Sequence, residues 1–191
     1  MPELFVSWSE YHQLIERLAI QVHQSGWEFD QIICLSRGGL RIGDVFSRLY
    51  RKPLGILAAS SYGGEGDIAT QRQGDRIRGK LTFARHVTTT AAQMGSHILL
   101  VDDLLDSGAT LKETIPWLKE NYPEQIIEIR TAVLWHKSHS VISPDYCVEF
   151  LEDNPWVHQP FERYEYMTIE ELASGLGSLK FPELDTRGKF G

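Results

Sequence analysis

Short, continuous apolar runs alternate along this chain with longer segments of helical periodicity. The apolar runs occupy residues 31–35, 54–59, 98–101 and 126–135. The helical patterns occupy residues 7–25, 40–50 and 110–121. Uninterrupted apolar runs are typical of strands buried on both faces, as in parallel sheets that are covered by helices. The alternation therefore predicts an α/β fold with a central, mainly parallel sheet flanked by helices.

Weaker patterns complete the expected order with a further strand, an irregular segment and a short helix. They lie at residues 80–87, 141–165 and 168–173. Ser7 and Glu10 have the spacing of a capping box, in which each side chain accepts a hydrogen bond from the other residue's backbone N–H. Ser9 is an alternative cap for this first helix.

Residues 63–79 are rich in glycine, glutamine, aspartate and arginine and nearly free of apolar side chains. A loop of this length within a compact domain is usually either functional or disordered. We therefore expect a long, mobile loop between the second and third strands of the sheet.

The most informative motif is the sequence ILLVDDLLDSGATL at residues 98–111. An apolar strand leads into two adjacent carboxylates, Asp102 and Asp103. The turn and helix start that follow consist of Asp106, Ser107, Gly108, Ala109 and Thr110. A turn of small residues before a helix presents free N–H groups at the positive end of the helix dipole. The motif therefore predicts a phosphate-binding site.

Three carboxylates beside a phosphate would repel it unless other groups compensate. The hydroxyl groups of a sugar could donate to Asp102 and Asp103, and a magnesium ion could bridge substrate oxygens. An isolated Asp-Asp pair is more often an ordinary strand end, but the extended motif favours a sugar phosphate with a divalent metal.

Composition excludes several other classes of protein. The formal net charge of -7 argues against a general nucleic-acid binder, which needs a positive face. No apolar run approaches the roughly 20 residues of a membrane-spanning helix, and the first residues lack the pattern of a secretory signal. Cys34 and Cys147 have no metal-binding or redox spacing, so we expect two reduced thiols and a cytoplasmic location.

The motif at residues 98–111 resembles the phosphoribosyl pyrophosphate signature of type I phosphoribosyltransferases. The resemblance implies that Asp102 and Asp103 hold the ribose hydroxyls beside Mg²⁺. It also implies that the loop from Asp106 to Thr110 holds the 5-phosphate. An aspartate at position 106 is typical of members that act on 6-oxopurines, where it lies near N7 of the base.

A second segment, Ser36, Arg37, Gly38 and Gly39, follows the first strand. It resembles the pyrophosphate-binding loop of the same family, which implies a non-proline cis peptide bond between Ser36 and Arg37. The chemistry agrees, because two glycines permit close backbone approach and the forked guanidinium of Arg37 can hold two phosphate oxygens. On its own, this tetrapeptide is more typical of a plain turn.

Ser61 and Tyr62 precede the glycine-rich loop and resemble the start of the flexible flap of this family. The resemblance implies a flap over residues 62–79 that closes on the active site, where Arg72 could reach the pyrophosphate. Closure would exclude water from the reacting centre. The alternative for Arg72 is an ordinary, solvated surface position.

Lys137, Asp145 with Tyr146, and residues 155–161 resemble the base-binding hood of xanthine-guanine phosphoribosyltransferases. The resemblance implies that Lys137 contacts O6 of the purine, Trp156 stacks on the ring and Val157 offers main-chain contacts. A tryptophan beside a proline is more often a packing residue than a base platform, so this role of Trp156 rests mainly on the resemblance. The sequence departs from the family at His158, where an acid is expected.

The resemblance covers residues 5–165 and implies the type I phosphoribosyltransferase fold. It divides the chain into a domain at residues 1–165, with a hood at 138–165, and an extension at 166–191. The implied reaction transfers the phosphoribosyl group of phosphoribosyl pyrophosphate to a purine base, releasing pyrophosphate and a nucleoside monophosphate. This is purine salvage, with Asp106 as the catalytic residue, and the family suggests a homodimer or homotetramer.

Three alternatives remain open from the sequence. The first is a regulator of the same fold that binds phosphoribosyl pyrophosphate or a nucleotide without catalysing transfer. The second is a phosphoribosyltransferase for another base. The third is a receiver-like signalling domain, although such a domain would place its acid pair near the first strand.

Overall fold

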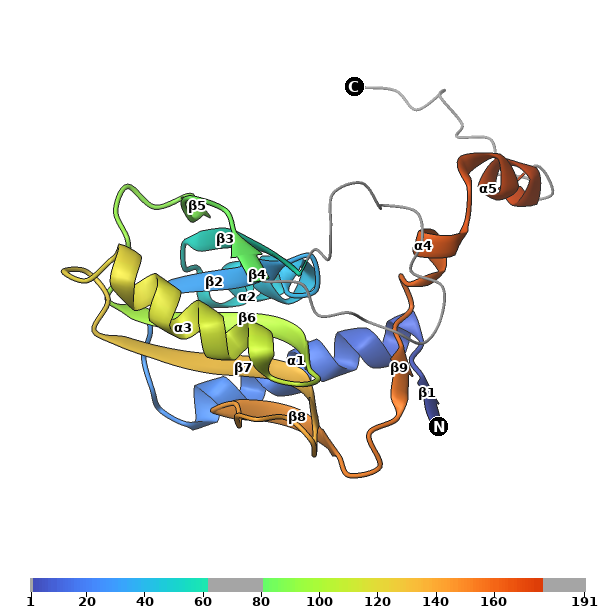
Figure 1. The fold of residues 1–191 in the computed structure, drawn as a ribbon, viewed down its shortest axis with the longest axis horizontal. Helices are drawn as coiled ribbons and strands as arrows, with labels where there is room; N and C mark the ends of the chain where they lie inside the picture. Colours follow the sequence, from blue (N-terminus) through green and yellow to red (C-terminus); the bar gives the residue numbers. More distant parts are fainter. Residues whose placement is uncertain (1, 62–80, 177–191) are drawn as a thin grey trace, which may run out of the picture.

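The computed structural model describes residues 2–61 and 81–176 (Figure 1). The strands are β1 (Glu3–Phe5), β2 (Gln31–Ser36), β3 (Leu54–Ser61), β4 (Leu81–Phe83), β5 (Thr88–Thr89), β6 (His97–Leu105), β7 (Glu128–Lys137), β8 (Tyr146–Leu151) and β9 (Trp156–His158). The helices are α1 (Trp8–Gln24), α2 (Leu40–Tyr50), α3 (Ala109–Asn121), α4 (Arg163–Tyr166) and α5 (Ile169–Leu176). The expected alternation of strands and helices is confirmed.

The main sheet has the strand order β4-β3-β2-β6-β7-β8, with β5 paired to β3 outside this path. Strands β3, β2, β6, β7 and β8 pair in parallel, whereas β4 and β5 run antiparallel to β3. The predicted α/β fold with a central, mainly parallel sheet is therefore correct.

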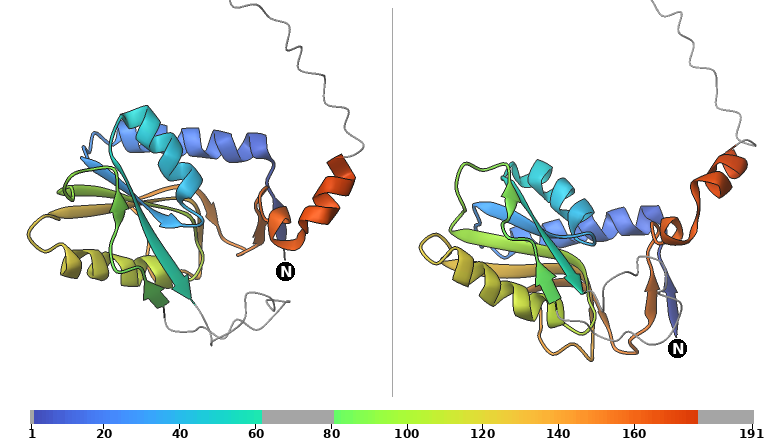
Figure 2. Two further views of the ribbon diagram at one scale, coloured as in Figure 1. Left: turned by 90° about the horizontal axis from the view of Figure 1, so that it is seen from above. Right: turned by 45° about the horizontal axis from the view of Figure 1, so that its top comes forward.

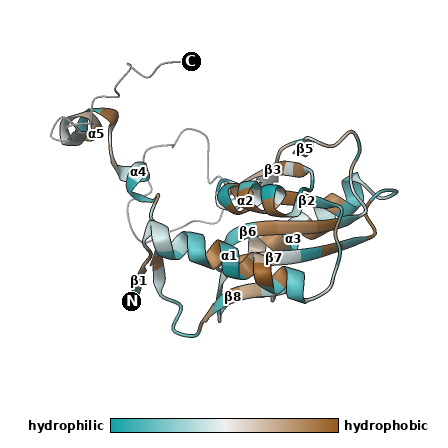
Figure 3. Ribbon diagram, turned by 180° about the vertical axis from the view of Figure 1, so that it is seen from behind, coloured by the Kyte–Doolittle hydropathy of each residue, from teal (hydrophilic) through white to brown (hydrophobic). Residues whose placement is uncertain are grey.

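Helices cover both faces of the main sheet, with α1 and α2 on one face and α3 on the other (Figure 2). Successive residues of the central strands point to opposite faces, so that Ile32 and Cys34 pack under α1 and α2 while Ile33 and Leu35 pack under α3. Hydrophobic residues dominate β6 and β7, which the helices enclose (Figure 3). Burial on both faces explains why these strands read as continuous apolar runs.

The first helix begins where its capping signal predicts. Ser7 is the N-cap of α1, and Ser7 and Glu10 form the reciprocal hydrogen bonds of a capping box. The alternative cap, Ser9, lies inside the helix. Gly26, with a positive φ of 69°, follows the end of α1 and turns the chain toward β2.

Several predicted boundaries were wrong. The run expected at residues 98–101 is longer, because β6 continues through the acid pair to Leu105. The strand expected at residues 126–135 is shifted toward Lys137, which is its last residue. The strand expected at residues 80–87 is reduced to Leu81–Phe83.

The expectation that residues 141–165 are irregular was also wrong. This segment contains β8, which is an edge strand of the main sheet, and β9, which pairs in parallel with β1. We refer to β1 and β9 together as the small sheet. It lies beside the carboxyl ends of the main strands and is followed by α4 and α5, which extend away from the main sheet (Figures 1 and 2).

Parts of the sequence-based expectations lie outside the described residues. They include the proposed flap at residues 62–79, with Tyr62 and Arg72, and the end of the extension at residues 177–191. Within residues 2–61 and 81–176, no helix combines the length and the apolar character needed to cross a membrane.

Candidate active site

The predicted binding segments converge at one edge of the main sheet. β2, β6 and β7 are adjacent and parallel, so their carboxyl ends and the residues just beyond them lie side by side. Ligands of open α/β sheets bind at this carboxyl edge, where the loops diverge. The topology therefore places the Ser36 loop, the acid pair and Lys137 in one site.

The loop after β2 packs directly against the end of β6. A Cβ atom on Gly38 would collide with the carboxyl group of Asp103, and one on Gly39 would collide with the carbonyl oxygen of Val101. The amide of Gly39 donates to the carbonyl oxygen of Leu35 at 2.8 Å, which fixes the turn. Both glycines are therefore needed for the close approach of this loop to β6, in addition to any access that they give a ligand.

The Ser36–Arg37 peptide bond is cis, as the resemblance implies. The Arg37 guanidinium donates to the carboxylate of Glu165, in α4, with an Nη2–Oε1 distance of 2.9 Å. The side chain of Arg37 is 82% exposed, and ion pairs in solvent contribute about 0–1 kcal/mol. Arg37 can therefore exchange Glu165 for a stronger anion at small cost.

The adjacent carboxylates Asp102 and Asp103 repel each other in a partly desolvated position. Desolvation, followed by the charge of Asp103, raises the pKa of Asp102 well above its ordinary value. No lysine, arginine or histidine within residues 2–61 and 81–176 forms an ion pair with Asp102 or Asp103. Hydroxyl donors or a divalent cation at this position would offset the repulsion between the two carboxylates.

The turn after β6 has the features of an anion-binding helix start. Gly108 is the N-cap of α3, with a φ of 78°. The hydroxyl oxygen of Ser107 accepts a long hydrogen bond, 3.4 Å, from the amide of Ala109, the first residue of the helix. A Cβ atom on Gly108 would lie 2.5 Å from the hydroxyl oxygen of Ser140. A cleft of about 590 Å³ runs along α3 and reaches this turn at Ser107 and Ala109. Thr110, in the first turn of α3, is half-buried beside them.

Asp106 connects this turn to the end of β7. One of its carboxylate oxygens, Oδ1, lies 3.0 Å from Nζ of Lys137 and 3.1 Å from Nε2 of His139. Lys137 is only 6% exposed, so its ammonium group is held in place by burial as well as by this contact. The structure therefore brings together two predicted site residues and adds His139, which sequence reasoning missed although it lies two residues beyond Lys137.

The two predicted base-contacting residues of the small sheet have opposite environments. Trp156 is 40% exposed, whereas Val157 is 4% exposed and packs in the core under α1. Val157 can therefore offer a ligand only its main chain. His158 stacks on Phe5 with ring centroids 4.3 Å apart and lies within 3.8 Å of the carboxylates of Glu3 and Glu162.

The hood motif at residues 155–161 includes Gln159, the residue after β9, but sequence reasoning assigned it no role. Its side-chain amide donates to Oδ2 of Asp103 at 2.5 Å, across 56 positions of sequence. No local pattern distinguishes this glutamine, because its partner is brought close only by the tertiary fold. Its position one residue after the Trp-Val-His strand is the one signal that could have drawn attention to it.

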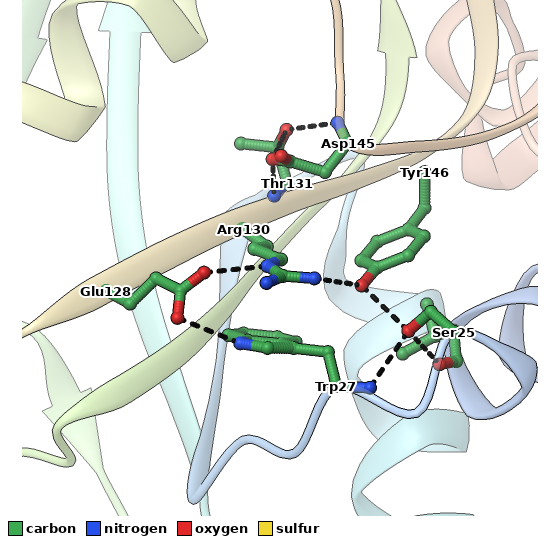
Figure 4. Close-up of polar contacts among 8 residues, drawn as sticks. Ser25, Trp27, Glu128, Arg130, Thr131, Asp145 and Tyr146 are labelled. Atoms are coloured by element: carbon green, nitrogen blue, oxygen red, sulfur yellow. Dashed lines mark hydrogen bonds and ion pairs between the residues drawn. The ribbon is translucent and has the colours of Figure 1, made fainter.

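Asp145 and Tyr146 do not join this site. They lie at the opposite, amino edge of the main sheet, because they immediately precede and begin β8, which is parallel to β7. Asp145 accepts hydrogen bonds from the amide and hydroxyl groups of Thr131, and Tyr146 joins a network with Ser25 and Arg130 (Figure 4). Their inclusion in the hood was an error of the sequence resemblance.

Comparison with known proteins agrees with the fold. The family described as phosphoribosyl transferase domain matches residues 7–166. A xanthine-guanine phosphoribosyltransferase from Idiomarina loihiensis is 31% identical over 90% of this chain and 93% of its own length. Another from Gluconobacter oxydans is 26% identical over 82% of this chain and 83% of its own length. The solved structure of a Helicobacter pylori xanthine-guanine-hypoxanthine phosphoribosyltransferase has a TM-score of 0.65 and 22% identity, covering 90% of this chain and 99% of that one.

Proposed function

The chain belongs to the phosphoribosyl transferase domain family, and from this premise we propose that it is a purine salvage enzyme. It transfers the 5-phosphoribosyl group of phosphoribosyl pyrophosphate to N9 of guanine, xanthine or hypoxanthine. The products are a nucleoside monophosphate and pyrophosphate. The observation that carries the proposal is the contact between Asp106 and the buried Lys137 beside the α3 turn, because it pairs a proton acceptor with a cation where a 6-oxopurine needs both.

In this proposal, phosphoribosyl pyrophosphate lies across the carboxyl edge of the main sheet. The turn from Ser107 to Thr110 holds the 5-phosphate on the free N–H groups of α3. Asp102 and Asp103 accept from the ribose hydroxyls. The loop of Ser36, Arg37, Gly38 and Gly39 holds the pyrophosphate, with Arg37 released from Glu165.

Mg²⁺ fits the acid pair. Asp102 and Asp103 offer hard oxygen ligands, they have no cationic partner among the described residues, and desolvation followed by their mutual repulsion raises the pKa of Asp102. No cluster of three or more metal-ligating side chains occurs within residues 2–61 and 81–176. Substrate oxygens and waters would therefore have to supply the remaining ligands of the ion. When bound, the ion would neutralise charge on the pyrophosphate.

The base is bound by groups from β7 and β9. Lys137 donates to O6 of the purine, Trp156 stacks on the ring and the main chain of Val157 contacts the base. Asp106 accepts the proton at N7, which leaves the N9 lone pair free to attack C1 of the ribose. Lys137 then offsets the negative charge that develops on O6. His139, whose Nε2 lies 3.1 Å from the same oxygen of Asp106, is a second neighbour that orients this carboxylate.

The organisation around this site completes the proposal. Residues 1–165 form the catalytic domain, with a flap at 62–79 that begins at Ser61 and Tyr62 and brings Arg72 to the pyrophosphate. Residues 138–165 contribute the hood, and residues 166–191 form an extension. We propose a homodimer or homotetramer that acts in the cytoplasm, where the free thiols Cys34 and Cys147 stay reduced.

A spectrophotometric assay tests this function directly. The protein is incubated with phosphoribosyl pyrophosphate, Mg²⁺ and, separately, guanine, xanthine, hypoxanthine and adenine. We expect a nucleotide from at least one 6-oxopurine and none from adenine. If no base reacts although phosphoribosyl pyrophosphate binds saturably, the chain is a regulator of the same fold or acts on another base.

A further inference from the structure

The carboxylate of Asp103 is held on three sides by the protein. The amide of Leu104 donates to Oδ1 at 2.8 Å, and the side-chain amide of Gln159 donates to Oδ2 at 2.5 Å. The backbone of Gly38 lies so close to the third side that a Cβ atom would collide with the carboxyl group. Asp103 therefore has little freedom to rotate, and Gln159 is the only one of the three contacts made by a side chain.

Gln159 is well suited to hold this orientation. It is 8% exposed, so its rotamer is restricted by packing. Because a carboxylate only accepts hydrogen bonds, the nitrogen of the amide must face Asp103, and its oxygen faces the other way. That oxygen is buried and has no hydrogen-bond partner in the part of the chain that the structure describes.

The position of Gln159 connects two parts of the site. It directly follows β9, the strand that carries Trp156 and Val157, and its carbonyl oxygen accepts from the amide of Glu162 at 3.0 Å. The small sheet and the main sheet share no paired strand. Gln159 therefore forms a direct hydrogen bond between the end of β9 and the end of β6.

We propose that Gln159 is a positioning residue that couples occupation of the base site to the binding of phosphoribosyl pyrophosphate. The inference rests on the proposed function. A base that stacks on the small sheet restricts the motion of β9. Because Gln159 follows β9 and donates to Asp103, this restriction also holds the carboxylate of Asp103 in the orientation that binds the ribose. By linkage, phosphoribosyl pyrophosphate then raises the affinity for the base by the same factor.

The test measures binding without turnover. Calorimetric titration with phosphoribosyl pyrophosphate and Mg²⁺ is performed with and without 9-deazaguanine, which has carbon at the position where the ribose would attach. The variant Gln159→Met keeps the volume of the side chain but removes the donor. We expect its affinity for phosphoribosyl pyrophosphate to fall about tenfold, as for a lost hydrogen bond to a charged group, and the effect of 9-deazaguanine on that affinity to disappear.

Gln31→Met is the matched control. Gln31 is also a buried glutamine of this fold, 1% exposed, and its side chain contacts Thr89 and the amide of Gly95 at the amino edge of the main sheet. This variant should lose stability but keep both the affinity and the coupling. If Gln159→Met does not fold, Gln159→Glu provides the same test, since it preserves the shape and replaces the donor by an acceptor.

Each outcome separates this inference from the proposed function. If the wild-type protein binds neither ligand, the proposed function fails and the inference fails with it. If the wild-type protein binds both ligands but without coupling, or if both Gln159 variants retain the coupling, the proposed function stands and the inference is overturned.

Discussion

The polar groups at the two edges of the main sheet differ in how completely they are paired within the protein. At the amino edge, Trp27 and Arg130 both donate to Glu128, and Arg130 also donates to Tyr146, which pairs with Ser25 (Figure 4). At the carboxyl edge, the described part of the chain leaves Asp102 and Asp103 without a cationic partner. Three buried polar atoms that accept or donate no hydrogen bond among the described residues, in Tyr11, His158 and Gln159, lie in or beside the segments at this edge.

Two aspartates show the same contrast in their pKa values. Burial would raise the pKa of Asp30, at the amino edge, but hydrogen bonds from Ser96 and the amide of His97 outweigh it and lower the pKa. At the carboxyl edge, desolvation and the neighbouring Asp103 raise the pKa of Asp102. Buried polar groups whose hydrogen bonds and charges are paired within the protein stabilise the fold. Groups that lack such partners occur mainly where a ligand supplies them. The contrast therefore supports a structural role for the amino edge and makes the carboxyl edge the candidate functional edge.

The largest expected effect is on turnover, which a substitution at the carboxyl edge should reduce and one at the amino edge should not. Asp106→Asn removes the proposed proton acceptor while keeping its shape, and general-base assistance typically contributes about 10²–10⁴-fold. We expect the turnover number to fall by that factor, with a much smaller change in the KM for phosphoribosyl pyrophosphate. Steady-state kinetics with the preferred 6-oxopurine measures both constants.

Asp145→Asn is the control for this variant at the amino edge. Asp145 accepts from the amide of Thr131 at 2.7 Å and from its hydroxyl group at 2.9 Å. Its replacement should lower stability and leave the turnover number within about threefold of the wild-type value, or ~0.7 kcal/mol. An unchanged turnover number in Asp106→Asn would show that Asp106 is not the proton acceptor.

The second effect compares stability. Asp30→Asn should lower the free energy of unfolding by about 1 kcal/mol, because the asparagine side chain has only one acceptor oxygen where the carboxylate has two. This value already allows for the solvent exposure of the side chain. Asp102→Asn should raise the free energy of unfolding, because it removes a charge that is desolvated and repelled. A gain of about 1 kcal/mol would raise the melting temperature by roughly 2–4 °C. Thermal unfolding without ligands or Mg²⁺ measures both changes.

The dependence on pH sharpens this second comparison. The pKa of Asp102 is higher in the folded than in the unfolded state, so stability is lost as the pH rises from about 4 toward the folded pKa. The advantage of Asp102→Asn should therefore be greatest at neutral pH and vanish toward pH 4. The pKa of Asp30 is lowered, so its contribution persists above about pH 4 and is lost only below it. An advantage of Asp102→Asn that grows as the pH falls would contradict this account.

The sequence predicts most of what depends on local pattern. Continuous apolar runs identified the buried strands, and the capping-box spacing offered Ser7, with Ser9 as the alternative, as the N-cap of α1. The family resemblance implied the cis peptide bond at Ser36–Arg37. The candidate site residues of the carboxyl edge could be proposed from the sequence because they lie at or just after the ends of buried strands, and parallel strands end at the same edge.

The features that the sequence did not predict depend on contacts between residues far apart in the chain. β1 has only three residues and becomes a strand because it pairs with β9, about 150 residues later. β8 is a half-buried edge strand, which lacks the continuous apolar pattern of the central strands. The contact of Gln159 with Asp103 and the position of Asp145 at the amino edge follow from the same topology. No local pattern in the sequence encodes them.

The smallest expected effect compares two tyrosine hydroxyl groups. Tyr50 donates to the carbonyl oxygen of Ala19 at 2.6 Å, whereas the hydroxyl of Tyr11 is fully buried without a described partner. Burial, followed by the charge of Asp103, raises the pKa of Tyr11, so this hydroxyl stays protonated at neutral pH. Tyr50→Phe should therefore cost about 0.5–1.5 kcal/mol of unfolding free energy, while Tyr11→Phe should be neutral or stabilising. Chemical denaturation measures the free energy of unfolding of both variants. A larger loss for Tyr11→Phe than for Tyr50→Phe would mean that the Tyr11 hydroxyl has a hydrogen-bond partner. It would also contradict the view that the carboxyl edge leaves its polar groups unpaired.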